Sequence, residues 1–106
     1  TRAMQLILMN DLLTAEQAMD WGLINEVVED DNLMDRTMEV ARQLANGPTL
    51  AFGEAKRLVA DSHSNSLETQ MELETRAICG LARASADTKE GISAFTNKRK
   101  PVFKGE

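Results

Sequence analysis

The side chains that could support nucleophilic or metal chemistry are few in this chain of 106 residues. Its one histidine, His63, and its one cysteine, Cys79, stand sixteen positions apart on different predicted elements. A structural zinc site needs four ligands, and a cysteine nucleophile needs a neighbouring base. We therefore expect no metal site, a solvated His63 in a polar loop, and Cys79 as a small buried packing residue.

Carboxylates are numerous, but none stands in a setting that would tune it for proton transfer. Glu68, Glu72 and Glu74 share one predicted helix, with Glu68 and Glu72 one turn apart. General acid–base catalysis needs a carboxyl group in an apolar pocket that shifts its pKa. Acids beside threonine, glutamine and arginine are typical of a solvated helix face, so the residues alone show no catalytic constellation.

Basic side chains gather at the C-terminus of an otherwise acidic protein. Residues 98–106, here called the tail, carry a formal charge of +3 from Lys98, Arg99, Lys100, Lys104 and Glu106. The whole chain carries a net charge of −5. A terminus of opposite sign either keeps the protein in solution or contacts something anionic. No glycine-rich loop of the kind that cradles phosphate occurs in the chain.

The composition favours helices over sheets. Aromatic residues make up 4% of the chain, with six methionines and no tyrosine. Leucine, methionine and alanine pack helices, whereas sheets favour β-branched and aromatic side chains. At this length we expect one compact domain. The acidity argues against nucleic acid as the main partner.

Compartment and chain start can also be read from the sequence. A single cysteine, no signal peptide and no apolar run of roughly 18–20 residues predict a cytoplasmic protein without a membrane partner. Thr1 is followed at once by the helical pattern RAMQLILM, without a capping sequence before it. This predicts a chain cut from something longer, although an expressed segment would look the same.

Two helices and a connector are predicted in the first 30 residues. The first helix stops near Asn10. The second opens with TAEQ, which has the form of a capping box from Thr14 to Gln17, and Gly22 ends it in the left-handed conformation. LINEVVED, residues 23–30, predicts an extended connector or a lone edge strand, since one strand forms no sheet.

The third helix begins with acids and carries an apolar stripe. Asp30, Asp31 and Asp35 suit a helix N-terminus, where the macrodipole favours negative charge. The spacing predicts a buried stripe composed of Met34, Thr37, Met38, Ala41, Leu44 and Ala45. NGP then closes this helix, and Pro48 can open the fourth.

Two more helices follow the polar stretch DSHSNS. Ser66 is expected to cap a long helix with an inward side composed of Leu67, Met71, Ile78 and Leu81. DTKE, with Asp87 as N-cap, predicts a second capping box and a last helix that Pro101 stops. The pattern predicts a mainly α fold of five or six helices with at most one short strand.

Three segments, in this order, carry a resemblance to a known family. They read LTAEQAMDWGLINEVVEDDNL, ARQLANGPTLAFGEAKRLV and EGISAFTNKRKPVFKGE. Together they resemble the enoyl-CoA hydratase/isomerase, or crotonase, superfamily over essentially the whole chain. The resemblance implies that residues 1–106 are the C-terminal helical domain of the ClpP/crotonase-like fold. The N-terminal spiral of ββα units would then lie before Thr1.

The resemblance places the chemistry outside these residues. In the family, two backbone amides of the N-terminal spiral stabilise a thioester enolate, and one or two carboxylates move the proton. It therefore implies a lyase or isomerase as the parent protein, no catalytic residue within 1–106, and an inactive chain by itself. Coenzyme A would enter as part of the acyl-CoA substrate, with no separate cofactor and no metal.

The resemblance does imply two coenzyme A contacts, at Phe95 and Lys98. In related enzymes an aromatic ring and a lysine at these places contact the adenine and phosphate groups, which suits a ring surface and a point charge. Arg99, Lys100 and Lys104 would strengthen the local field. The alternative is that Phe95 belongs to the core and the lysines keep the terminus in solution.

The resemblance also implies a role in assembly and a subclass. Family members are trimers or dimers of trimers, so the chain would roof the acyl-CoA site and supply subunit contacts. SLETQMELETRAICGLARASADTKEGISAF is similar to the phenylacetate-degradation branch, while straight-chain enoyl-CoA hydratases of fatty acid metabolism share much of the pattern. Two other readings are a stand-alone helical binding or assembly module and an unrelated acidic helical adaptor.

Overall fold

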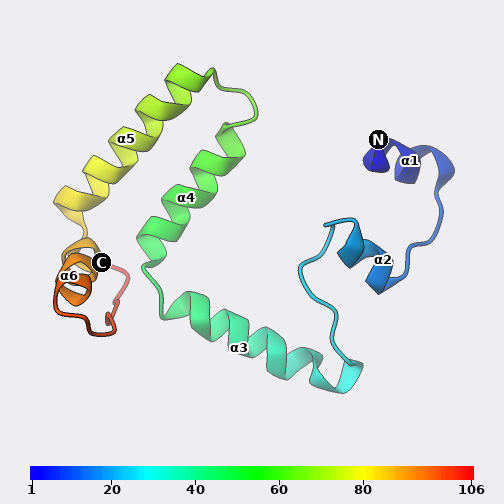
Figure 1. Ribbon diagram of the computed structural model, residues 1–106, viewed down its shortest axis with the longest axis horizontal. Coiled ribbons are helices and arrows are strands. Elements are labelled where there is room, and N and C mark those ends of the chain that lie inside the picture. The colour runs from blue at the N-terminus through cyan, green and yellow to red at the C-terminus, as the bar shows by residue number, and fades with distance from the viewer. The chain divides into compact units, whose positions relative to one another are not determined.

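The computed structural model describes residues 1–106 as helices joined by turns and extended connections (Figure 1). The elements are α1 (Arg2–Met9), α2 (Ala15–Asp20), the 3₁₀ turn η1 (Asp30–Asn32), α3 (Leu33–Ala45), α4 (Thr49–Asp61), α5 (Leu67–Ala84) and α6 (Ala86–Thr96). The absence of any strand confirms the mainly α prediction. LINEVVED is a connector without a strand, with bends at residues 23–25 and with Asp30 already in η1. None of the helices is both long and apolar enough to cross a membrane.

The chain divides into two compact units, Thr1–Thr37 and Met38–Glu106, with the boundary inside α3. In the first unit the predicted capping box of α2 is confirmed. The Gln17 N–H donates to Thr14 Oγ1 at 3.2 Å, and the Thr14 N–H donates to Gln17 Oε1 at 3.0 Å. Helix α1 ends at Asn10, as predicted, and Asn10 is left-handed. Gly22, which follows α2, has the predicted left-handed conformation.

Two arginine side chains connect separate segments of the first unit. The guanidinium of Arg2 lies over the ring of Trp21, 5.4 Å from its centroid, which ties α1 to the end of α2. The Arg36 Nε donates to both carboxylate oxygens of Glu26 at 2.9 and 3.0 Å. This bond fastens the connector 23–29 to the start of α3.

The second unit is built on a hairpin of α4 and α5, which lie side by side and antiparallel (Figure 1). Ser66 caps α5 as predicted, its Oγ accepting the N–H of Thr69 at 3.2 Å. Gln70 then joins the two helices, because its Nε2 donates to the carbonyl of Leu58 in α4 at 3.2 Å. The loop 62–66 holds the exposed His63, as predicted.

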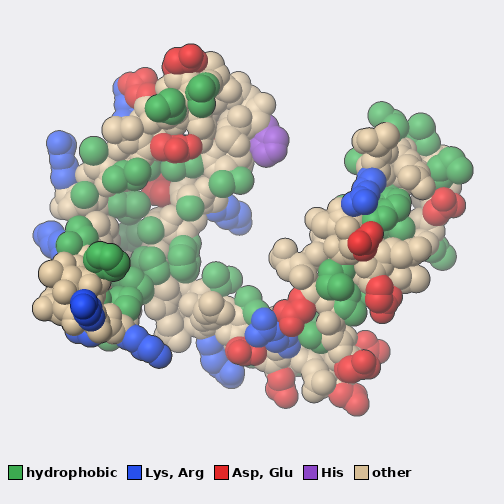
Figure 2. Space-filling view, in the orientation of Figure 1, with side chains coloured by type: hydrophobic (Ala, Val, Ile, Leu, Met, Phe, Trp, Pro, Cys, Tyr) green, Lys and Arg blue, Asp and Glu red, His purple; other side chains and the backbone are tan.

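The predicted burial is wrong at several positions. In α3 every member of the predicted stripe is exposed. In α5 the predicted inward residues Leu67, Met71 and Ile78 are exposed, and only Leu81 is partly buried. Cys79 is exposed rather than packed. Figure 2 shows hydrophobic side chains open to solvent over the α4–α5 hairpin. The pattern marks amphipathic helices, but nothing within the chain covers these faces.

The predicted bounds of α6 are also wrong. The helix begins at Ala86 with Ser85 as its N-cap, because Ser85 is extended and its Oγ accepts the Thr88 N–H at 3.3 Å. Asp87 therefore lies inside the first turn and is not a cap. The helix ends at Thr96, well before Pro101, because the chain turns into the left-handed conformation at Lys98.

The cap of α5 yields a test of the hairpin. Ser66→Ala removes the acceptor for the Thr69 N–H, and we expect a loss of about 0.5–2 kcal/mol in the free energy of unfolding. Ser66→Asp keeps an acceptor at the same place and should retain stability. Urea unfolding followed by far-ultraviolet circular dichroism compares the variants. Equal midpoints for Ser66→Ala and the unchanged protein would contradict the capping role.

Candidate functional site

Helix α6 and the tail contain the buried residues of the chain and are joined by several hydrogen bonds. The buried residues of the chain lie at or within this helix, namely Ser85, Asp87 and Ala94. The tail runs back beside α6, so that the C-terminus lies next to this helix (Figure 1). No buried polar side-chain atom lacks a hydrogen-bond partner. Two carboxylates of α6, Asp87 and Glu90, hold the tail in this position.

Asp87 holds the end of the tail. Its carboxylate is only 4% exposed and accepts the N–H groups of Lys104 and Gly105, both at 2.8 Å. The main-chain oxygen of Glu106 accepts the Asp87 N–H and the Ser85 hydroxyl, both at 3.0 Å. These bonds explain why Asp87 does not act as an N-cap.

Glycine is required at position 105 for two reasons. Its φ of +78° lies in the left-handed region. A Cβ there would stand 2.7 Å from Thr49 Oγ1, closer than such atoms approach. The end of the tail therefore fits closely against the start of α4.

Glu90 holds the middle of the tail. Arg99 Nη2 donates to Glu90 Oε2 at 2.7 Å, and Arg99 Nη1 donates to Oε1. The N–H of Val102 donates to the same Oε1 at 2.9 Å. The hydrogen bonds from Arg99, joined by the one from Val102, lower the pKa of Glu90 to about 2. One carboxylate thus binds the residues on both sides of Lys100 and Pro101.

The turn between α6 and the tail is a Schellman motif. The Lys98 N–H donates to the carbonyl of Phe95 at 3.2 Å, and the Arg99 N–H donates to that of Ala94 at 3.0 Å. Lys98 occupies the position where glycine is usual, with φ of +52°. A left-handed conformation costs a residue with a Cβ roughly 1–2 kcal/mol. Lysine therefore stands at a place that glycine would occupy at lower cost.

The two predicted ligand-contact residues lie at this turn. The ring-bearing residue Phe95 is 88% exposed in this chain. Lys98 is exposed too, at the C-terminal end of α6, where the helix dipole favours a cation. Their contact with coenzyme A stays a prediction.

The four cations of the tail are not equivalent. Arg99 is paired with Glu90, so its charge is neutralised locally and strengthens the field around the turn less than the sequence suggests. Lys98, Lys100 and Lys104 are exposed and make no ion pair. These three ammonium groups are available to an anion.

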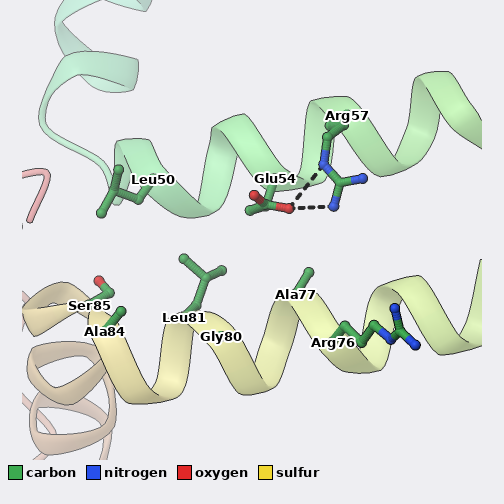
Figure 3. Close-up of a pocket in the computed structure, with 9 residues that line it drawn as sticks. All are labelled: Leu50, Glu54, Arg57, Arg76, Ala77, Gly80, Leu81, Ala84 and Ser85. Carbon is green, nitrogen blue, oxygen red and sulfur yellow. Dashed lines mark hydrogen bonds and ion pairs between the residues drawn. The ribbon is translucent and has the colours of Figure 1, made fainter.

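A groove of about 300 Å³ lies between α4 and α5 (Figure 3). Its charged side chains are already paired, because Arg57 binds Glu54 at 2.7 Å and Asp61 at 3.3 Å. Arg76, which also lines it, binds Glu72. Glu68 and Glu74 lie on the exposed surface of α5, as predicted, and Glu74 accepts a hydrogen bond from Gln70. No three His, Cys, Asp or Glu side chains come together as metal ligands.

Sequence reasoning missed the roles of Asp87 and Glu90. Their partners lie nine to eighteen residues further along the chain. The available signal was the pair of acids one turn apart at the start of a helix, followed by a basic tail with no acid before Glu106.

The chain is similar to known proteins over nearly its whole length. The model of the enoyl-CoA hydratase/isomerase family matches residues 1–106. The chain is 46% identical over 105 residues to a 1,2-epoxyphenylacetyl-CoA isomerase of Escherichia coli. It is 34% identical over 103 residues to a 2,3-dehydroadipyl-CoA hydratase of the same organism. These matches cover 99% and 97% of the chain, and 40% of each relative.

The chain also superposes on solved structures of enoyl-CoA hydratases. Enoyl-CoA hydratase subunit I of Geobacillus kaustophilus superposes with a TM-score of 0.90 at 36% identity. An enoyl-CoA hydratase of Bacillus anthracis superposes with a TM-score of 0.87 at 31% identity. Each match covers 99% of this chain and 40% of the solved one. The chain thus spans about 40% of the length of the proteins that it matches, and the matched part is helical.

The hydrogen bonds that Glu90 accepts from Arg99 and Val102 predict that stability depends on pH. The Glu90 pKa of about 2 lies below the ordinary 4.5, so the folded state favours the ionised form. The contribution of Glu90 to stability is complete above about pH 4.5 and is lost as the pH falls through about 2. Carbon-detected NMR titration of the Glu90 carboxyl measures this pKa. Arg99→Gln should raise it toward 4.5, and an unchanged value in that variant would contradict the assigned cause.

Proposed function

The chain belongs to the enoyl-CoA hydratase/isomerase family, and from this membership we propose that it forms the C-terminal helical part of an enzyme acting on acyl-CoA thioesters. The parent enzyme would stabilise a thioester enolate with backbone amides and move protons with carboxylates. No carboxylate of this chain matches a catalytic one in the resemblance. The chemistry is therefore assigned to the part of the enzyme that residues 1–106 do not include.

The observation that carries the proposal for these residues is the turn at the end of α6. Phe95 presents a nearly bare ring, and Lys98, three residues on, presents an unpaired ammonium group. A ring offers a surface for an adenine base, and an ammonium offers a point charge for phosphate. Residues held in a costly backbone conformation cluster at functional sites, and Lys98 is such a residue.

The charge of the tail supports the same role. The chain carries a net charge of −5, so an anionic ligand is repelled by most of its surface. Lys98, Lys100 and Lys104 are the cations of the tail that no carboxylate neutralises. Lys98 is proposed as the direct contact, with the other two attracting the phosphates of coenzyme A.

We extend the proposal to assembly because of the exposed apolar faces. Leucine, isoleucine and methionine side chains of α3 and α5 are open to solvent, including Met34, Leu67 and Ile78. Exposed apolar patches of this kind mark contact surfaces. In the enzyme they would roof the acyl-CoA site and meet neighbouring subunits, in a trimer or a hexamer.

The choice of substrate class follows the similarity to the isomerase. The 46% identity to a 1,2-epoxyphenylacetyl-CoA isomerase exceeds the 34% identity to a 2,3-dehydroadipyl-CoA hydratase. This difference favours the phenylacetate-degradation branch, with a ring-containing acyl group, over straight-chain substrates.

Substitution of Lys98 tests the proposed contact. Lys98→Gly in the full-length enzyme removes the ammonium and relieves the left-handed strain. We expect the KM for acyl-CoA at low salt to rise about tenfold, which corresponds to about 1.4 kcal/mol. The thermal midpoint should stay the same or rise. Salt should shrink the difference in KM, because it screens the ammonium.

Lys89→Gln is the matched control, since Lys89 is an exposed lysine in the first turn of the same helix. It removes the same charge away from the turn and should leave the KM unchanged. An unchanged KM in Lys98→Gly at low salt would rule out the contact.

A further inference from the structure

We propose that Glu90 is a positioning residue for coenzyme A binding, and that its ion pair with Arg99 holds the turn that presents Lys98. This inference rests on the proposed function of Lys98. It adds a residue that touches no ligand and acts through its neighbour.

Arg99 follows Lys98 directly and is held at both its main chain and its side chain. Its N–H binds the carbonyl of Ala94, which is 1% exposed, and its guanidinium binds Glu90 in a two-pronged arrangement. Such paired hydrogen bonds fix orientation as well as distance. The residue after Lys98 therefore has little freedom to rotate.

The hydrogen bonds of this turn offset the cost of the left-handed conformation at Lys98. Lys98 is in the left-handed conformation, which a residue with a Cβ tends to leave, and the two Schellman hydrogen bonds around it oppose that change. The net contribution of one such hydrogen bond is similar in size to the cost of the conformation. The bonds of Glu90 to Arg99 and to the Val102 N–H add the margin that keeps the turn closed.

The ion pair of Glu90 with Arg99 is suited neither to stabilising the whole protein nor to binding phosphate. The side chains of Glu90 and Arg99 are 24% and 43% exposed, and ion pairs in such settings contribute little to overall stability. Arg99 is also unavailable as a phosphate ligand while Glu90 occupies its guanidinium. The pair is therefore suited to fixing local geometry.

Asp87 offers a matched control within the same helix. Its carboxylate is more buried and also holds the tail, but it binds the N–H groups of Lys104 and Gly105, far along the tail from Lys98. Asp87→Asn should loosen the end of the tail and lower stability. It should leave the turn at Lys98 in place.

The experiment measures KM and kcat of the full-length enzyme with an acyl-CoA substrate at low salt. Glu90→Gln keeps the size of the side chain and an acceptor for Val102, but loses the charge that holds Arg99. We expect its KM to rise about threefold to tenfold, since contacting residues of one network couple by energies of this order. The kcat should stay unchanged, and Asp87→Asn should change KM less than about twofold despite its lower thermal midpoint.

A double variant separates positioning from general loosening. If Glu90 acts through Lys98, Glu90→Gln should have no further effect on KM once Lys98→Gly is present. Arg99→Lys, which keeps the charge but not the two-pronged bond, is a second route to the same result should Glu90→Gln fold poorly. It should raise KM with kcat unchanged.

The outcomes distinguish the two proposals. An unchanged KM in Lys98→Gly overturns the proposed coenzyme A contact, whatever Glu90 does. A raised KM in Lys98→Gly with an unchanged KM in Glu90→Gln overturns only the positioning role. The same holds if Asp87→Asn raises KM as much as Glu90→Gln, or if the effects of Glu90→Gln and Lys98→Gly add.

Discussion

The binding of main-chain N–H groups and Arg99 by two carboxylates of α6 is the interaction on which the C-terminal end of this protein depends. Asp87 and Glu90 lie one helical turn apart, so both face the returning tail. Asp87 lies in the first turn of α6, where the helix dipole favours a negative charge. Asp87 holds the end of the tail at Lys104 and Gly105, and Glu90 holds its middle at Arg99 and Val102.

The rest of the chain shows the opposite situation, in which helices form but have little to pack against. Ala94 is its one buried hydrophobic residue, although 42% of the residues are hydrophobic. The α4–α5 hairpin is joined by the cap at Ser66 and by the bond from Gln70 to Leu58. Most of the stability of helices in proteins comes from packing of an apolar face. The exposed faces therefore leave most of these helices without the packing that stabilises helices in other proteins.

Charge and geometry have separate roles in the tail. Its net positive charge is visible in the composition, but the structure divides it into one internal cation, Arg99, and three free ones. Lys98 differs from Lys100 and Lys104 because its backbone is held in the left-handed conformation at the end of a helix. A disordered basic terminus could attract an anion equally well, but only a fixed turn keeps the backbone of Lys98 at one place near that of Phe95.

The sequence by itself determined the helices, most of their caps and the family. The capping box at Thr14, the cap at Ser66 and the left-handed Gly22 are encoded by residues within one helical turn of each other, so neighbouring side chains suffice to predict them. Only the tertiary structure decided which apolar faces are covered and that Asp87 binds the tail instead of capping α6. It also decided that Cys79 is exposed and that Glu90 binds Arg99. The physical reason is distance along the chain: a cap bonds to its own helix, whereas burial and long-range hydrogen bonds depend on what folding brings alongside.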